Sequence, residues 1–149
     1  MTLTIYDTRF VANSWLLLDW LNAMKFPENV LYSSEHMWTR ADEDGLWVAG
    51  ISDYAQDLLG DVVFVDPPKV GDSLTAGKPC GLVESVKTGS DLHAPLDGKV
   101  TAINEEVLNS PEYLNDKPYQ HWIFKFSPSD ATQAEKLLSA SAYQALIDQ

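Results

Sequence analysis

Apolar and polar positions alternate along the middle of this sequence in short runs that are typical of β-strands. Runs of about 4 to 8 residues, bounded by Gly, Pro, Asp or Asn, favour an all-β sandwich or a flattened barrel over alternating βαβ units. The expected strands are Met37–Arg40, Leu46–Ile51, Val62–Val65, Gly81–Ser85, Gly89–Leu92, Lys99–Asn104 and Trp122–Phe126. Asp42–Gly45 is expected to form the hairpin turn between the first two.

Three segments have the spacing of helices instead. Phe10–Met24 places apolar residues on one face and is followed by Pro27, which stops a helix. Ser52 is expected to cap a short helix that runs to Leu59 and closes at Gly60. Near the C-terminus, Asp130 and Gln133 resemble a capping box ahead of apolar anchors at Leu137, Leu138, Tyr143, Leu146 and Ile147. We therefore predict one domain over residues 1–149 that is mainly β, with helices at both ends and residues 1–26 as an N-terminal helical extension.

Two tryptophans of this N-terminal segment have two interpretations. Trp15 and Trp20 lie beside the tightest apolar stripe of the predicted helix. They either widen its buried face or form an exposed aromatic patch for a partner.

Charge and composition exclude several classes of function. The chain of 149 residues has 22 acidic and 10 basic side chains, which gives a net charge of −12. An acidic surface repels phosphate backbones, so no nucleic-acid partner is expected. The N-terminus shows no basic targeting segment, and no stretch approaches the roughly 20 apolar residues of a membrane span, so we expect a cytoplasmic protein without membrane association.

Cysteine and histidine usage argues against a metal or redox centre in the protein itself. Cys80 is the only cysteine, so an internal disulfide, a thiolate cluster and a C-x-x-C pair are excluded. His36, His93 and His121 are widely separated and lack the spacing of metal ligands. We therefore expect no metal site and interpret Cys80 as a core residue.

The segment that indicates function surrounds Lys87. Two expected strands meet at this lysine, which places it at or beside a tight turn. A lysine at a hairpin tip is ordinarily a solvated charge. However, Lys87 has acidic neighbours, Gly71 lies sixteen residues before it and Gly98 eleven residues after it. This layout is typical of a swinging-arm carrier, because a lysine supplies both a nucleophilic amine and a flexible four-carbon stem for a tethered cofactor.

From Leu31 to Ile147 the sequence resembles the glycine cleavage H proteins. The matching residues are Glu35-His36-Met37-Trp38, Gly50–Gln56, Leu59–Val65, Glu84-Ser85-Val86-Lys87, Ser90-Asp91, Ala94-Pro95, Ser110-Pro111-Glu112, Pro118-Tyr119 and Trp122–Lys125. The resemblance implies a hybrid barrel-sandwich of two antiparallel sheets, with lipoate attached to Lys87 and no catalytic residue in the chain itself. It also implies that Glu84, Gly71 and Gly98 are recognised during lipoylation. His36, Met37 and Asp91 match positions in the cleft that receives the loaded arm.

The partners implied by the resemblance are a lipoate-protein ligase or lipoyl transferase, and dihydrolipoamide dehydrogenase. The pathway remains open between two readings. H proteins usually have glutamate at the position of Met37, where it holds the charged aminomethyl group, and methionine has no acceptor for an ammonium. This departure favours the similar lipoate-binding proteins of bacterial sulfur oxidation, which work with a heterodisulfide-reductase-like complex. The alternative is glycine cleavage, with glycine decarboxylase and aminomethyltransferase as partners.

Three smaller departures and two remote alternatives complete the comparison. Thr88-Gly89 follows the lysine where two small residues, typically alanines, are usual; Gln120-His121 replaces a glycine-rich turn; and the N-terminal extension is longer than usual.

A biotinyl carrier has a related fold, but its lysine normally lies between methionines, whereas Val86 and Thr88 flank Lys87. An unmodified β-sandwich that only binds a partner is the second remote alternative.

Overall fold

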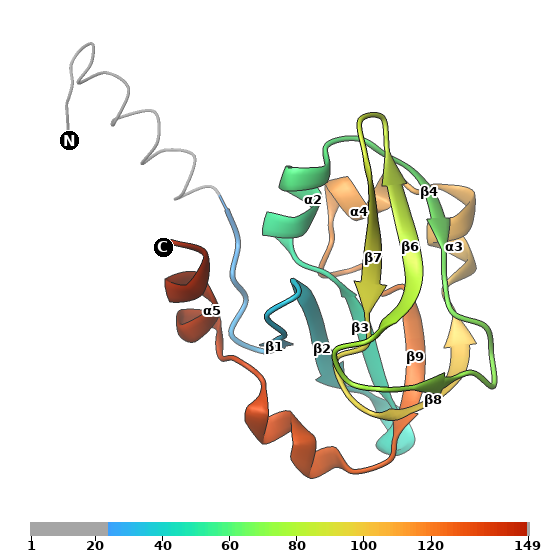
Figure 1. The fold of residues 1–149 in the computed structure, drawn as a ribbon, viewed down its shortest axis with the longest axis vertical. Coiled ribbons are helices and arrows are strands. Elements are labelled where there is room, and N and C mark those ends of the chain that lie inside the picture. Colours follow the sequence, from blue (N-terminus) through green and yellow to red (C-terminus); the bar gives the residue numbers. More distant parts are fainter. Residues whose placement is uncertain (1–23, 149) are drawn as a thin grey trace.

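Two antiparallel sheets form the body of the computed structural model, which describes residues 24–148 (Figure 1). The larger sheet has the strand order β1-β2-β3-β9-β8-β5, and the smaller has the order β4-β6-β7. The strands are β1 (Leu31–Tyr32), β2 (Met37–Ala41), β3 (Trp47–Ile51), β4 (Val62–Asp66), β5 (Ser73–Leu74), β6 (Pro79–Ser85), β7 (Gly89–His93), β8 (Gly98–Ile103) and β9 (Phe124–Pro128). The mainly β fold of two antiparallel sheets is confirmed.

The core between the sheets is built from inward-facing residues of both. Val83 and Leu92 of the smaller sheet and Val100, Phe124 and Phe126 of the larger sheet are almost completely buried in one cluster. Alternation along each strand sends one side chain in and the next one out. In β6 and β4, for example, Val83 and Val65 are paired and buried, whereas their neighbours Glu84 and Phe64 are paired and exposed. The sandwich therefore holds the β6–β7 hairpin rigidly along its base.

All seven expected strands are present, with shifted ends. The last strand begins at Phe124 rather than Trp122, because the Ile123 amide bonds to the Ala49 carbonyl outside the regular ladder, at 2.7 Å. Asp42–Gly45 joins β2 to β3 as predicted, through a short 3-10 turn, η1 (Glu43–Gly45). The two-residue strands β1 and β5, and the helices α3 (Glu105–Asn109) and α4 (Tyr113–Asp116), were not predicted.

Helix α2 (Asp53–Leu59) confirms the expected short helix after β3. The Ser52 side chain caps it by accepting a hydrogen bond from the Ala55 amide, and the helix ends at Gly60, which has a positive φ of 82°. Figure 1 shows α2 beside the β6–β7 hairpin, with its C-terminal end towards the hairpin tip.

The predicted C-terminal helix is divided into two parts. A 3-10 segment, η2 (Ala131–Lys136), is followed by α5 (Ala140–Ile147). Between them, Leu138 exchanges two backbone hydrogen bonds with Tyr32 of β1, at 2.9 and 2.7 Å, so the chain is extended there. The capping-box prediction holds for Asp130, whose side chain caps the 3-10 segment by accepting from the Thr132 amide, but it is wrong for Gln133, whose side chain bonds to Asp97 instead.

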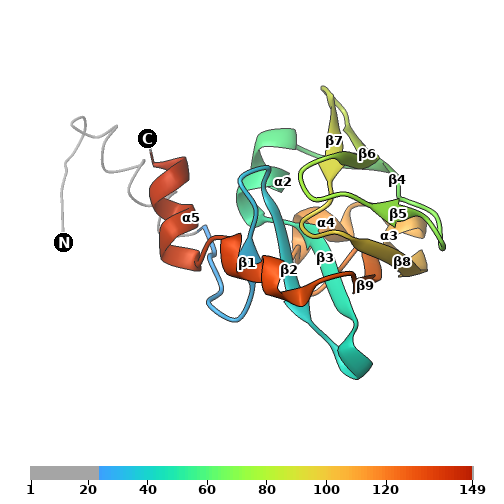
Figure 2. The ribbon, with the colours of Figure 1, turned by 60° about the horizontal axis from the view of Figure 1, so that its bottom comes forward.

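Helix α5 packs at the outer edge of the larger sheet rather than between the sheets. Its Tyr143 is fully buried and stacks on Tyr32 at a ring-centroid distance of 4.5 Å, within a second apolar cluster that includes Trp38. Figure 2 shows α5 beside β1, on the side of the larger sheet away from β8 and β5. α5 is thereby fixed to the sandwich by one aromatic anchor.

The expectations for the N-terminal segment lie mostly outside the described residues. Of the helix expected over residues 10–24, which includes Trp15 and Trp20, only Met24 lies within the described residues. Met24 lies in a bend and Lys25 and Phe26 in irregular chain, so the predicted helical extension over 1–26 is not helical at its last three residues.

Candidate functional site

The tip of the β6–β7 hairpin presents Lys87 to solvent. Its turn is fixed by Ser85: the Ser85 amide donates to the Thr88 carbonyl at 2.7 Å, and the Ser85 hydroxyl accepts from the amides of Lys87 and Thr88 at 3.3 and 3.1 Å. The Val86 amide donates to the Asp61 carbonyl at 3.0 Å, which ties the tip to the start of β4. Backbone position is thus fixed while the lysine side chain is exposed.

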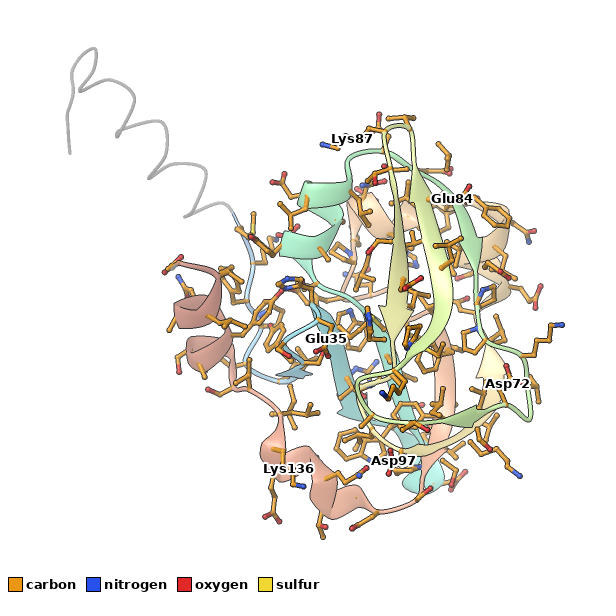
Figure 3. All side chains as sticks on the ribbon, in the orientation of Figure 1. Glu35, Asp72, Glu84, Lys87, Asp97 and Lys136 are labelled. Carbon is orange, nitrogen blue, oxygen red and sulfur yellow. The ribbon has the colours of Figure 1, made fainter. Side chains whose placement is uncertain are left out.

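The Lys87 side chain extends over the end of α2. A Cβ built on Gly60 would lie 3.3 Å from Lys87 Cε and 3.8 Å from Nζ, so the stem passes over the glycine that ends the helix. Figure 3 shows Lys87 at the tip of the hairpin, with Glu84 farther along β6. The amine therefore lies where a modifying enzyme can reach it.

Glu84 lies on the outer face of the smaller sheet. It is exposed, and its strand partners are Phe64 on β4 and Gly89 on β7. Glu84 is therefore accessible, on the strand that leads to the Lys87 turn.

Gly71 and Gly98 lie at the other end of the molecule. Figure 3 shows their neighbours Asp72 and Asp97 far from Lys87, towards β5 and β8. Gly71 has a φ of 95°, and a Cβ on Gly98 would strike the Ser127 carbonyl and lie 3.0 Å from Pro128 Cα. The positive φ of Gly71 and the close backbone packing around Gly98 thus each favour glycine. The structure does not bring either residue to the lysine.

A cleft of about 270 Å³ opens directly beside the hairpin. The first two residues after Lys87, Thr88 and Gly89, are part of its wall. The full lining consists of Glu35, His36, Met37, Ile51, Ala55, Leu58, Leu59, Val83, Thr88, Gly89, Ser90, Asp91 and Leu92. The structure thus brings together in one cleft the three residues that the family resemblance assigned to the cleft of the loaded arm, namely His36, Met37 and Asp91.

The cleft has an apolar floor and an acidic rim. Met37 is only 1% exposed, so it contributes apolar packing and closes the floor. Glu35 and Asp91 are exposed at the wall, and the lining contains no Lys or Arg. Burial lowers the pKa of His36, with Glu35 opposing the shift, so this imidazole is neutral at pH 7. Two carboxylates therefore set the charge of the cleft.

Sequence reasoning missed three residues that support the cleft. Tyr143 Oη lies 2.8 Å from His36 Nδ1 and 2.8 Å from Ser52 Oγ, and the Tyr54 ring lies 5.1 Å from the His36 ring. His36 and Tyr143 are 107 residues apart, so no local pattern could have paired them. Glu35 was noticed only as part of a motif.

Cys80 is remote from this chemistry. It is half-buried in β6 and packs against the core, and burial raises the pKa of its thiol to about 12. Within residues 24–148 no group of three or more His, Cys, Asp or Glu side chains is placed to hold a metal ion. In the same range no helix is long and apolar enough to cross a membrane.

A β scaffold that exposes Lys87 at a hairpin tip beside a cleft is the arrangement expected of a swinging-arm carrier. The sequence model of the family described as glycine cleavage H-protein matches residues 30–149. The chain belongs to this family, and such a protein is a carrier subunit rather than a catalyst.

Individual relatives agree with this assignment. The chain is 62% identical over 124 residues to a glycine cleavage system H protein of Methylobacillus flagellatus, covering 83% of this chain and 99% of the relative. It is 48% identical to one of a Shewanella species, covering 83% and 96%. The crystal structure of a glycine cleavage system H protein from Mycobacterium marinum matches with a TM-score of 0.75 at 35% identity, covering 83% and 99%.

These relatives correct the preferred pathway. All of them carry the name of the glycine cleavage system, and no finding supports the sulfur-oxidation reading or its heterodisulfide-reductase-like partner. The alternative of glycine cleavage fits better. The inference from Met37 failed because it gave one position too much weight, although Asp91 and Glu35 keep carboxylates in the same cleft.

Proposed function

We propose that this protein is a lipoyl carrier of glycine cleavage, with lipoate joined to Lys87 through an amide. The observation that carries the proposal is the exposed Lys87 at a fixed hairpin tip, one residue from the wall of a cleft. Lipoate supplies a dithiol–disulfide couple that accepts a group or two electrons, while separate enzymes catalyse each transfer. Lipoate-protein ligase or lipoyl transferase, glycine decarboxylase, aminomethyltransferase and dihydrolipoamide dehydrogenase are the proposed partners.

The residues around Lys87 suit such an attachment. The amine lies on an exposed stem, and Glu84 offers a carboxylate on the adjacent outer surface. We assign Glu84 to recognition by the lipoylating enzyme. Gly71 and Gly98 lie at the far end of the molecule and have backbone roles, and their recognition by the lipoylating enzyme stays a prediction.

The charge of the cleft favours an aminomethyl cargo over a sulfur adduct. Acylation converts the Lys87 ammonium into a neutral amide, which leaves Glu35 and Asp91 as the charged groups of the wall. A cationic ammonium is attracted to two carboxylates, whereas an anionic sulfur adduct is repelled. Glu35 thus supplies, two residues earlier in the chain, a carboxylate that Met37 lacks.

Intact-mass analysis tests the attachment. The protein is incubated with lipoate, ATP and a lipoate-protein ligase, and Lys87→Ala is treated in parallel with Lys69→Ala, an exposed lysine elsewhere, as the matched control. We expect one lipoyl increment in the wild type and in Lys69→Ala, and none in Lys87→Ala. An increment that persists in Lys87→Ala would remove Lys87 from its role.

A reconstituted glycine cleavage assay tests the cargo. Wild-type carrier is expected to support glycine decarboxylation, and Glu35→Gln is expected to weaken retention of the loaded group. No turnover with fully lipoylated wild type and active partner enzymes would refute the assignment to glycine cleavage.

A further inference from the structure

The cleft has a residue with an unusual backbone at its wall. His36 has a φ of 73°, in the left-handed region that few residues other than glycine occupy. Its backbone is held on both sides, because its amide donates to the Ser33 carbonyl at 3.1 Å and its carbonyl accepts from the Ser52 amide at 3.0 Å. A strained residue that the surrounding structure holds in place is a reason to look for function.

A chain of hydrogen bonds assigns the protons on His36. Ser52 Oγ is fully buried and accepts from the Ala55 amide at 3.1 Å, so its own hydrogen must go to Tyr143 Oη, its one other partner among the described residues. Tyr143 Oη then donates to His36 Nδ1. The neutral imidazole consequently carries its proton on Nε2. The opposite order would leave the buried Ser52 hydrogen without an acceptor, which is costly.

Nε2 of His36 is free to act in the cleft. His36 lines the cleft, its Nδ1 is engaged by Tyr143, and its Nε2 has no partner within residues 24–148. Among the described residues, the buried side-chain nitrogen or oxygen atom that lacks a partner is His93 Nδ1. His36 Nε2 also lacks a partner but is not buried, so it is open to solvent.

Helix α2 places His36 at the distance of the arm's end. Lys87 lies over Gly60 at one end of α2, and the His36 ring contacts Tyr54 at the other. The six rises from Tyr54 to Gly60 span about 9 Å at 1.5 Å per residue. A lipoyl-lysine arm is roughly 15 Å long when extended, given bonds of about 1.5 Å. The sulfur-bearing end of an arm laid along α2 therefore reaches His36.

We propose that His36 Nε2–H donates a hydrogen bond to a sulfur at the end of the arm, and that Tyr143 of α5 is a positioning residue that fixes this tautomer with Ser52. The inference rests on the proposed attachment of lipoate to Lys87. It gives the C-terminal helix a part in the site: no residue of α5 lines the cleft, yet Tyr143 determines which nitrogen of His36 presents a proton to the arm.

The first experiment uses the unmodified protein and does not depend on lipoate. Long-range ¹⁵N–¹H NMR spectra of the histidine rings distinguish the two neutral tautomers. At pH 8 we expect a single Nε2–H form for His36 in the wild type and in the control Tyr113→Phe, whose tyrosine lies outside this network, and a mixture in Tyr143→Phe. An Nδ1–H form in the wild type, or an unchanged spectrum in Tyr143→Phe, would overturn the proposal.

The second experiment uses lipoylated, reduced protein. The alkylation rate of the arm's thiols by iodoacetamide is compared among the wild type, His36→Asn, Tyr143→Phe and Tyr113→Phe. Loss of one neutral hydrogen bond is expected to raise the rate by about twofold to tenfold in His36→Asn and Tyr143→Phe, with no change in Tyr113→Phe. Equal rates in all four proteins would refute the donor role.

Mass analysis precedes the alkylation comparison and separates the two proposals. A protein without a lipoyl increment on Lys87 contradicts the proposed function. A protein that is lipoylated, but whose thiol alkylation rate does not change when His36 or Tyr143 is substituted, contradicts only the present inference. His36→Asn retains a residue that tolerates the left-handed region, so its folded state remains available for the test.

Discussion

Replacing Met37 by glutamate tests whether the floor of the cleft can hold a carboxylate. Met37 is 1% exposed and belongs to the main core cluster, opposite Ile51 in the β2–β3 ladder. A glutamate here must either ionise in an apolar site or remain protonated, because burial raises the pKa of a carboxyl. We therefore expect Met37→Glu to destabilise the protein rather than to improve its cleft.

The magnitude follows from the size of that pKa shift. A rise of about 2 units from the unfolded value near 4.3, moderate for a buried carboxyl, adds about 2.7 kcal/mol of destabilisation at pH 7.5, at about 1.36 kcal/mol per unit. As the pH falls through the raised pKa, the folded state takes up the proton first, so the penalty decreases. By pH 4.5 it should be below about 0.6 kcal/mol.

The assay is urea unfolding followed by tryptophan fluorescence at pH 7.5 and 4.5. Met37→Gln is the matched control, since it has the same shape without the charge, and Met37→Leu should cost less than about 1.5 kcal/mol. The free energy of unfolding of Met37→Glu minus that of Met37→Gln cancels the acid sensitivity of the other groups. Equal stability of the two variants at pH 7.5 would refute the reasoning and would mean that a side chain at position 37 opens onto the cleft.

Three further outcomes follow from the structure. Gly98→Ala should lose about 1–3 kcal/mol of unfolding free energy in a urea titration, because its Cβ strikes the Ser127 backbone; an unchanged midpoint would contradict that contact. Cys80 should react slowly with iodoacetamide at pH 8 in the folded protein, since burial raises its thiol pKa to about 12, and fast in urea; equal rates would contradict its burial. Burial lowers the pKa of His36 in the folded state, so the unfolded state binds more protons below about pH 6.5 and stability falls there. His36→Asn should lose less stability than the wild type between pH 8 and 5.5, as measured by urea unfolding, and an equal loss would refute this assignment.

The strands and the hairpin tip were predictable because their signals are local. Alternation with a period of two, together with a glycine or an Asp-rich turn, defines a strand within a few residues. Lys87 was found in the same way, from two adjacent strands that meet at a turn. Elements of two to five residues, such as β1, β5 and α3, contain too few positions for a period to be visible.

The C-terminal region and the support of the cleft depend on distant contacts instead. The helix predicted from Asp130 is interrupted because Leu138 pairs with Tyr32, more than a hundred positions away. Gln133 had the spacing of a capping box, yet its side-chain carbonyl accepts from the Asp97 backbone amide at 2.9 Å. Tertiary hydrogen bonds that satisfy a backbone or side-chain group outweigh such local preferences. The same reason explains why Tyr143 and Ser52 could not be connected to His36 from the sequence.

Helix α2 links the two ends of the proposed site and so determines its dimensions. Its last turn meets the Lys87 stem at Gly60, and its capping residue Ser52 orients His36 through Tyr143. Removing one residue from α2 would shorten it by about 1.5 Å and rotate one end by about 100° relative to the other. That change would move Lys87 out of register with His36, the proposed donor, even if the rest of the protein remained folded. The length of α2, rather than any single side chain, therefore keeps the anchor of the arm and the group that receives its end in register.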